Sequence, residues 1–408
     1  MIYIFTCLYI LCLRLVFVLV KNTLPFFYMI FFGIMYFGTV LNLEIGLDSD
    51  IFYYILILCF LFTFTFTTIF FNIKYPISKK LKAFKLQPII YDSRKTVNLF
   101  WLLVIISSLF TLLYFYLLGY NIFSLVINDF SSADIATQRI NAYSGERYFA
   151  PGYFNQFKNA LLPVSITILL FNKTKNKKIL YYFFIPIAFF GLVGTGQRAF
   201  LLFSFLSVLL TFFYLGKFKI KSAIIPSIVV LLIFGAGSFF LGRTEEFTIS
   251  STVENLLNRV FYQEQYEALI TFRYIYEIPI TYGYDWYRAL IGIFPGIKGS
   301  EIQHIVFGLI HGNPRGMAAI SFIGSIYHNF GLMGVIIISS LLAYILNLLT
   351  YNFLTKKKNV GNVVLFSFIT FYTSMFSSGD IIFLFNKGVV LLLILSFLIY
   401  KFRLTWKT

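Results

Sequence analysis

Residues 243–259, RTEEFTISSTVENLLNR, begin a stretch of the chain that ends at residues 325–331 with SIYHNFG. It is the longest segment that is neither apolar enough to cross a bilayer nor basic enough to lie on its cytoplasmic side. It contains all three histidines, His304, His311 and His328, and six of the positive side chains. We therefore expect this stretch to carry the chemistry of the chain, and the rest to hold it at a membrane.

The composition indicates an integral membrane protein. Of 408 residues, 59% are hydrophobic and 12% are charged, whereas soluble domains are roughly 45–50% apolar and 25% charged. The net charge of +17 does not indicate nucleic-acid binding, because that requires basic side chains gathered on one solvated face, and here most lie in short runs between apolar segments. We predict a single all-α, polytopic membrane domain over residues 1–408.

The apolar segments set the number of membrane-spanning helices. Each needs about 20 mostly apolar residues, and eleven segments qualify: 2–20, 24–41, 51–73, 98–118, 157–171, 179–195, 199–215, 222–241, 330–354, 360–377 and 381–400. The fifth, sixth and seventh are short enough to be tilted or irregular. Residues 119–156 and 243–329 form two large polar loops, and we expect helices within the second.

The connecting segments alternate in charge, which fixes their sidedness by the positive-inside rule. One set is basic and has Asp92 as its only acid; it comprises Lys21, the segments 74–95, 173–178, 217–221 and 356–358, and the tail after residue 400. The other set carries all the remaining acids. We predict that the first set, with the C-terminus, is cytoplasmic, and that the second set, with both large loops, is external.

The external positive charges are mostly arginine, whereas the cytoplasmic ones are mostly lysine. The positive-inside rule gives no reason for arginines to lie on the external side. A planar guanidinium binds phosphate through two parallel hydrogen bonds, whereas lysine offers a point charge. We predict that several of these arginines hold an anion, and ion pairing with the external acids is the competing explanation. They are Arg139, Arg147, Arg198, Arg243, Arg259, Arg273, Arg288 and Arg315.

The second large loop contains a predicted helix. Ser251-Thr-Val-Glu254 is a capping-box pattern, which starts a helix when an apolar run follows, and the helix should reach residue 277. A spacing of seven places three of its residues on one face: Arg259, Tyr266 and Arg273. That face either follows a sugar chain or phosphate, or is simply solvated. The aromatic residues at 282–287 either stack on sugars or lie at headgroup level.

Two turn motifs each place an arginine beside apolar sequence. Gly194-Thr-Gly-Gln-Arg198 joins two short spans, and an arginine next to the hydrocarbon core is costly without a partner. Asn313-Pro-Arg-Gly316 leads into the apolar stretch 317–326, so Arg315 would lie where a re-entrant or short helix begins, and the positive end of that helix would attract an anion. We predict ligand-binding roles for Arg198 and Arg315.

The motif Tyr327-His-Asn-Phe-Gly331 interrupts an apolar run just before the ninth span. Imidazole ordinarily titrates near pH 6.5 and can accept a proton from a hydroxyl at neutral pH. We predict His328 as a general base, and a hydrogen-bonded interfacial histidine is the alternative. His311 is the second choice for the base and His304 the third.

Several reaction classes lack the residues that they require. No P-loop pattern appears, and the cytoplasmic segments hold a single acid, so metal–nucleotide chemistry has no ligands there. No cluster of His, Cys and Asp has the spacing of a metal site, and no Ser-His-Asp arrangement is legible. We predict a reaction that uses neither a metal ion nor a cofactor.

The spans, the Gly-Gln-Arg198 turn, the arginine-bearing loop and Tyr-x-Asn-Phe-Gly331 together resemble the Wzy-type O-antigen or oligosaccharide repeat-unit polymerases. The resemblance covers most of the chain in layout, although many members have an acidic residue where this chain has His328. It implies a metal-independent glycosyltransferase in the bacterial inner membrane, with its site facing the periplasm. Its donor and acceptor would be repeat units on undecaprenyl pyrophosphate, and a flippase and a chain-length regulator would be its protein partners.

The resemblance also implies roles for individual residues. Arg198, Arg243 and Arg315 would hold the donor pyrophosphate, and His328 would help to deprotonate the acceptor hydroxyl. The remaining residues of the expected substrate-binding set are Arg259, Arg288, His311, Tyr327 and Asn329. Two rivals stay open, a flippase or transporter of the same lipid-linked oligosaccharide and an O-antigen ligase.

Overall fold

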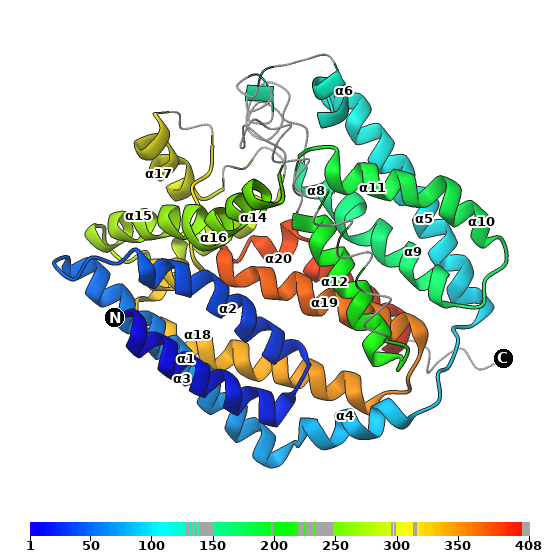
Figure 1. Cartoon of the computed structure of the whole chain (residues 1–408), viewed down its shortest axis with the longest axis horizontal. Helices are drawn as coiled ribbons and strands as arrows, with labels where there is room; N and C mark the ends of the chain where they lie inside the picture. Colours follow the sequence, from blue (N-terminus) through cyan, green and yellow to red (C-terminus); the bar gives the residue numbers. More distant parts are fainter. Residues whose placement is uncertain are drawn as a thin grey trace. The chain divides into compact units, whose positions relative to one another are not determined.

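The chain is helical in the computed structural model (Figure 1). The structure describes residues 1–127, 131, 134, 137–138, 151–196, 199–218, 224, 228, 232, 248–294, 297, 299–312 and 316–401. Within these residues no strand forms, and the β-type contact is an isolated parallel bridge between Ile90 and Asn359. Six of the described helices are long and apolar enough to cross a membrane, namely α1 (Ile2–Val20), α2 (Leu24–Leu41), α3 (Asp48–Lys74), α5 (Arg94–Leu118), α18 (Phe322–Thr355) and Val360–Ser378, which combines α19 (Val360–Ser374) and η4 (Met375–Ser378). The all-α, polytopic prediction is confirmed.

The other described helices are shorter. They are α4 (Ile77–Leu86), α6 (Ile122–Ile127), α8 (Pro151–Asn155), α9 (Leu162–Phe171), α10 (Lys177–Ile179), α11 (Ile185–Val193), α12 (Ala199–Tyr214), α14 (Ile249–Asn258), α15 (Glu264–Glu277), α16 (Tyr284–Ile291), α17 (Ile302–His311), α20 (Phe383–Asn386) and α21 (Val389–Lys401). Three segments are π-helical: η1 (Gln156–Leu161), η2 (Leu180–Phe184) and η3 (Arg259–Gln263). Because η1 and η2 lie in the fifth and sixth predicted spans, the irregularity expected there is present.

One predicted span differs from the structure, and another is largely untested. The eleventh, 381–400, is divided between α20 and α21 by a turn at Lys387-Gly388, where Gly388 adopts φ 79°. A Cβ on Gly388 would lie 2.6 Å from the Cβ of Ala160, so the turn depends on close packing that the sequence does not display. The eighth, 222–241, lies almost entirely outside the described residues.

Two compact units make up the chain, and each combines segments that are distant in the sequence. Unit 1 comprises Met1–Phe84, Leu256–Lys356 and Thr373–Phe383. Unit 2 comprises Lys85–Asn255, Lys357–Tyr372 and Leu384–Thr408.

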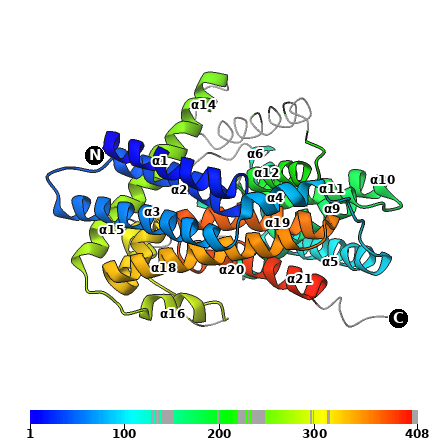
Figure 2. The same cartoon turned by 90° about the horizontal axis from the view of Figure 1, so that it is seen from below.

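In unit 1, α1, α2, α3 and α18 lie side by side, and α16 lies along α18 (Figure 2). Buried amides join α3 to α18, because Asn347 Nδ2 donates to Thr68 Oγ1 (3.1 Å) and Asn72 Nδ2 donates to Asn347 Oδ1 (3.4 Å). Such bonds hold helices together in a bilayer, where apolar contact with lipid competes with apolar contact between helices. The ring of Tyr53 stacks on Phe272 of α15 at 4.0 Å between centroids.

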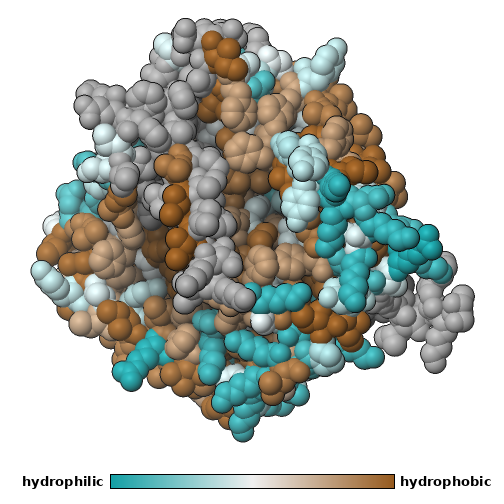
Figure 3. Space-filling model, turned by 45° about the vertical axis from the view of Figure 1, so that its right-hand side comes forward, coloured by the Kyte–Doolittle hydropathy of each residue, from teal (hydrophilic) through white to brown (hydrophobic). Residues whose placement is uncertain are grey.

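In unit 2, α5 packs against η1 and α9. Ser93 caps the start of α5 by accepting from Thr96 N, and Gly119 ends the helix in the left-handed conformation. The other side of α5 exposes apolar residues that include Leu102, Leu109 and Tyr116. Figure 3 shows one face of the molecule, on which hydrophobic side chains cover much of the surface and hydrophilic ones gather in patches. Such a surface is suited to contact with lipid.

Candidate functional site

A break in α18 organises the candidate site in unit 1. Gly331 adopts φ 66° and ψ −165° inside the helix, a conformation that is essentially restricted to glycine. The break releases the carbonyls of the preceding turn, and a crossing segment satisfies two of them: Thr281 N donates to His328 O and Gly283 N to Asn329 O, each at 2.9 Å. The motif at 327–331 therefore ends a short helix that precedes the long span, as its polar residues indicated.

The short helix begins later than predicted. It starts at Phe322, where Ser321 accepts a hydrogen bond from Gly324 N at 3.0 Å as the N-terminal cap. The described residues 316–321 are not helical, so the predicted helix start at Arg315 is wrong. The loop helix, in contrast, begins earlier than expected: Ser251 N donates to Thr248 Oγ1 and Thr248 N to Ser251 Oγ, so the reciprocal cap starts at Thr248.

Asn329 fixes the crossing segment to the short helix. Its Oδ1 accepts from Trp286 N (3.0 Å) and from the Thr281 hydroxyl (3.2 Å), while its Nδ2 donates to Ser325 O (2.9 Å). The side chain is fully buried. These bonds give Asn329 a positioning role, and its predicted contact with substrate stays a prediction.

A chain of hydrogen bonds then leads to a buried acid. Trp286 Nε1 donates to Ser325 Oγ (2.8 Å), and the Ser325 hydroxyl donates to Asp380 Oδ1 (2.7 Å). The side chain of Asp380 is 3% exposed and also accepts from Ile381 N. Burial raises the pKa of Asp380 to about 6, and the negative charge of Asp285 adds to the shift. Asp380 can therefore gain or lose a proton near neutral pH.

His328 lies in the same buried cluster. Its side chain is 2% exposed, and no described group forms a hydrogen bond with its Nδ1. Asp285, also buried, is close enough to interact electrostatically with both His328 and Asp380. An imidazole with an available ring nitrogen beside carboxylates can take part in proton transfer. His328, Asp285 and Asp380 therefore form a cluster of three buried titratable groups around the short helix.

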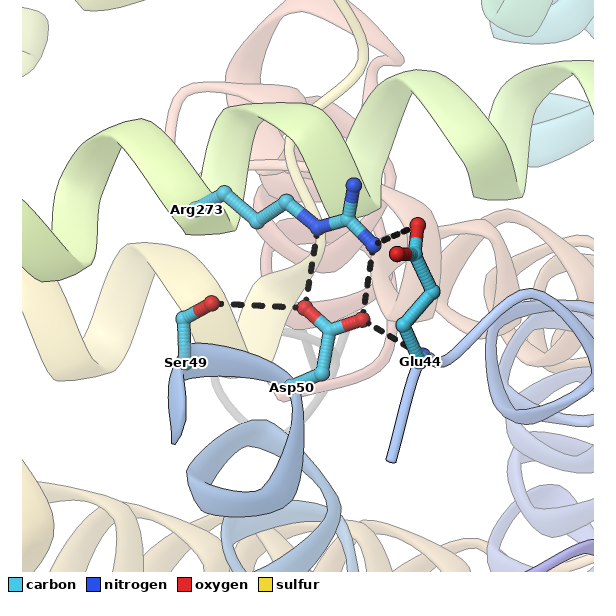
Figure 4. Close-up of polar contacts among 4 residues, drawn as sticks. All are labelled: Glu44, Ser49, Asp50 and Arg273. Carbon is cyan, nitrogen blue, oxygen red and sulfur yellow. Dashed lines mark hydrogen bonds and ion pairs between the residues drawn. The ribbon is translucent and has the colours of Figure 1, made fainter. Parts of the chain in front are cut away.

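Arg273 forms a second polar cluster in unit 1 (Figure 4). Its Nε and one terminal nitrogen donate to the two oxygens of Asp50 at 2.9 and 2.7 Å, and the same terminal nitrogen donates to Glu44 at 2.9 Å. Asp50 is fully buried and also accepts from Glu44 N. These bonds, chiefly those with Asp50, hold the pKa of Arg273 above its ordinary value. For Arg273, ion pairing with acids is the explanation that the structure supports.

Three other predicted residues have partners in unit 1. Arg288 lies 3.5 Å from a carboxylate oxygen of Glu301, and both side chains are partly exposed. His311 Nε2 lies 3.6 Å from Glu267. The ring of Tyr327 packs between those of Phe52 and Phe272, with centroids 5.3 and 5.6 Å away. None of these contacts reveals a substrate, so the binding roles stay predictions.

The remaining predicted residues lie wholly or partly outside the described part of the chain. Arg198, Arg243 and Arg315 are not among the described residues, and Arg259 is described in its backbone only. That backbone opens η3, whereas Tyr266 and Arg273 lie in α15. The predicted stripe therefore includes a side chain outside the described part of the chain and stays a prediction.

Sequence reasoning missed four members of the cluster around His328: Trp286, Ser325, Asp285 and Asp380. A signal existed for Asp380, because a carboxylate between two apolar segments is costly unless it has a function or a partner. Trp286 belongs to the aromatic run for which sugar stacking and headgroup contact are the two predicted roles. Its ring centroid lies 5.1 Å from that of Phe330, and its Nε1–H is bonded to Ser325. Among the residues that the structure describes, no three His, Cys, Asp or Glu side chains meet as metal ligands.

Fold and site define a multi-span helical membrane protein with a buried acid–base cluster beside a broken helix. A family model described as "Putative O-antigen polymerase" matches residues 144–377, more than half of the chain, and the chain belongs to this family. The resemblance noted in the sequence is thereby confirmed. The curated proteins and the solved structures compared with the chain gave no match. The matched region contains Asp285 and His328 and ends three residues before Asp380.

Proposed function

We propose that this protein polymerises oligosaccharide repeat units carried on undecaprenyl pyrophosphate, on the periplasmic face of the bacterial inner membrane. Membership of the O-antigen polymerase family carries the proposal. The acid–base cluster and the alternation of charge along the sequence support it. A flippase would supply the substrate, and a chain-length regulator would act on the same product.

In the proposed reaction, a hydroxyl of the acceptor sugar attacks the anomeric carbon of the donor sugar. The new glycosidic bond forms as the bond to the pyrophosphate oxygen breaks, and pyrophosphate leaves on its lipid. The hydroxyl proton passes to His328. Arg198, Arg243 and Arg315 would offset the charge that develops on the leaving group, an electrostatic contribution that is commonly the largest in such reactions.

Replacement of His328 tests its proposed role. A general base contributes roughly 10²- to 10⁴-fold to rate, so His328→Ala should shorten the polymer ladder on a gel toward a single repeat unit, at unchanged protein level. His304→Ala is the matched control, since His304 Nδ1 is bonded to Gly316 O at 2.7 Å, and it should leave the ladder intact. An undiminished ladder in His328→Ala would remove His328 from the mechanism.

The arginines need a separate experiment. Arg198, Arg243 and Arg315 are each replaced with Lys and with Ala, membrane insertion is confirmed, and chain length is measured. We expect the Ala variants to lose long polymer and the Lys variants to retain part of it, because Lys keeps the charge without the paired hydrogen bonds. Normal polymer in every Ala variant would refute the arginine site.

The phenotype of a deletion separates the rival functions. A polymerase predicts loss of the ladder with one repeat unit still attached to the lipid core. Loss of all surface repeat units would instead indicate a flippase or a ligase.

We also infer that no metal ion takes part, because arginines can supply the positive charge. Polymerisation in membranes washed with EDTA should therefore equal that in untreated membranes.

A further inference from the structure

A fully buried lysine in unit 2 has no described acid beside it. Lys158 lies in η1 and is 0% exposed. Its ammonium donates to Asn159 Oδ1 (3.1 Å) and Gly191 O (3.5 Å), and lies 5.3 Å from the centroid of the Tyr114 ring. These partners are neutral, and none of the ion pairs among the described residues includes Lys158.

The described acids of unit 2 are accounted for elsewhere. Asp92 accepts from Asn172 and Gly361, and the ten residues of α9, about 15 Å long, separate Asn172 from η1. Asp134 is exposed and bonded to Ser131. Glu254 is exposed. A charged ammonium withdrawn from water is costly without a counter-charge, so the surroundings of Lys158 require another explanation.

Further donors lie in the segments that contact Lys158. An ammonium has three N–H groups, of which two are used in the bonds above. The amide Nδ2 of Asn159 and the hydroxyl of Thr195, both buried, form no hydrogen bond with the described residues. Thr195 lies in the turn that directly follows α11, four residues after the Gly191 carbonyl that Lys158 contacts.

A second cation approaches the same place. Lys387 interacts electrostatically with Lys158, and its Nζ lies 4.8 Å from the centroid of the Phe200 ring. The neighbouring Gly388 packs directly on Ala160, which keeps this turn against η1. By the predicted sidedness, Lys158, Thr195 and Lys387 all lie at the external ends of their spans. Two positive charges, together with the Asn159 amide and the Thr195 hydroxyl, thus belong to one predicted level of the membrane. At that level π-helical η1 supplies the irregular backbone often found at functional sites.

We propose that Lys158, Asn159, Thr195 and Lys387 form an anion site in unit 2 that binds a phosphate or diphosphate group at the level of the outer leaflet. Binding of the anion does not depend on the proposed function. Its identification with the pyrophosphate of the lipid-linked substrate rests on that function. The competing explanation is that Lys158 only caps the last carbonyls of α11, as basic residues do at helix C-termini.

The test measures binding of inorganic pyrophosphate to the purified full chain in detergent micelles by calorimetry. Lys158→Met should weaken binding about 10- to 100-fold, the ordinary effect of losing a charge-assisted hydrogen bond. Lys358→Met is the matched control. Lys358 is also a buried lysine of unit 2, 2% exposed, and donates to a backbone carbonyl, that of Lys85, at 3.0 Å, so its replacement should leave the affinity within about twofold.

Equal affinity of Lys158→Met and wild type would overturn the site, and so would an equal loss in Lys358→Met. If Lys158→Met does not fold, Thr195→Val decides the matter, because it removes one hydroxyl donor at nearly constant shape and should weaken binding about 3- to 10-fold. Wild-type affinity in that variant would count against the site.

Competition identifies the source of the anion. Undecaprenyl pyrophosphate should displace inorganic pyrophosphate at lower concentration than phosphatidylglycerol does, if the site holds the carrier. The reverse order would support the anion site but assign it to a phospholipid headgroup. A Lys158→Met strain that loses pyrophosphate binding yet makes a full polymer ladder would likewise keep the site and overturn its link to the reaction. A His328→Ala protein should bind pyrophosphate normally, so a failure of the proposed function is distinguishable from a failure of the site.

Discussion

Arg273 in unit 1 and Lys158 in unit 2 are both cations withdrawn from water, and their surroundings are opposite. Arg273 is held by two carboxylates, one of them fully buried, through three hydrogen bonds. Lys158 is more deeply buried but contacts an amide, a backbone carbonyl and an aromatic ring. The first cation is neutralised by the fold, whereas the second has its charge available for a ligand.

This contrast changes the interpretation of the positive charges that are predicted to be external. Ion pairing accounts for Arg273, and Arg288 also has a carboxylate partner in Glu301. The anion hypothesis therefore rests on arginines beyond the described residues and on Lys158. An excess of one residue type in a sequence does not identify a binding site, because the acids that neutralise it can come from distant segments.

The largest expected effect is a difference in the free energy of unfolding between variants at the two cations. Asp50→Asn leaves Arg273 partly buried without its main counter-charge, and breaking such a pair costs about 3–5 kcal/mol. Lys158→Met removes a charge that has no described counter-charge, so it should leave the free energy of unfolding unchanged or raise it. Chemical unfolding in micelles measures both. If Lys158→Met destabilised the protein as much as Asp50→Asn does, the charge of Lys158 would be needed for folding, as that of Arg273 is.

The pH dependence of stability tests Asp380, a buried acid of unit 1 that forms no ion pair with the described residues. The pKa of Asp380 rises from 3.8 to about 6 in the folded state, so the native state binds the proton more tightly than the unfolded chain does. The resulting stabilisation is complete below about pH 4 and is lost as pH rises through about 6. The shift corresponds to about 3 kcal/mol.

Asp380→Asn has no such titration. The difference in unfolding free energy between wild type and this variant should therefore fall by about 3 kcal/mol from pH 4 to pH 7. Asp285→Asn should reduce that fall, because the charge of Asp285 contributes to the raised pKa of Asp380. A difference that stays constant with pH would mean that Asp380 is charged throughout and has a cationic partner after all.

Much of the fold can be predicted from the sequence because spans and breaks are local signals. Apolar length located the six described helices that are long enough to span a membrane, and the polar motif ending at Gly331 marked the break in α18. Boundaries that depend on packing were missed, such as the turn at Gly388 against Ala160. The π turn that begins at Arg259 was likewise not predicted from the sequence.

The site was less predictable, because its groups meet through tertiary contacts. Asp50 and Arg273 are 223 residues apart, so their pairing has no pattern in the sequence. Asp380 reaches Ser325 across 55 residues. Lys158 stands alone in an otherwise apolar segment, where a single lysine resembles a side chain that extends toward the headgroups. Its burial and its neutral hydrogen-bond partners, which the structure shows, distinguish Lys158 from such an extended side chain.

Substitution of Gly331 tests whether unit 1 needs the break in α18. Gly331 has φ 66°, and a Cβ there would lie 3.0 Å from Ile280 Cδ1. Gly331→Ala should therefore cost about 1–3 kcal/mol and shorten the polymer, because the carbonyls of His328 and Asn329 would lose their alignment with the crossing segment. Gly46→Ala is the control, since a Cβ there meets nothing within 4 Å. Gly331→Ala with wild-type unfolding and polymer would show that the break is not needed.

The smallest effect concerns Arg288, whose surroundings are intermediate between those of Arg273 and Lys158. Its contact with Glu301 is 3.5 Å long and half of the Glu301 side chain is exposed, so Glu301→Gln should change stability by under about 1 kcal/mol. If Arg288 contacts the substrate anion, Arg288→Gln shortens the polymer while Glu301→Gln, which only releases the guanidinium, does not. Equal shortening in both variants would place Arg288 with Arg273 as a structural cation. Normal polymer in both would leave Lys158 and the arginines beyond the described residues as the anion-binding groups.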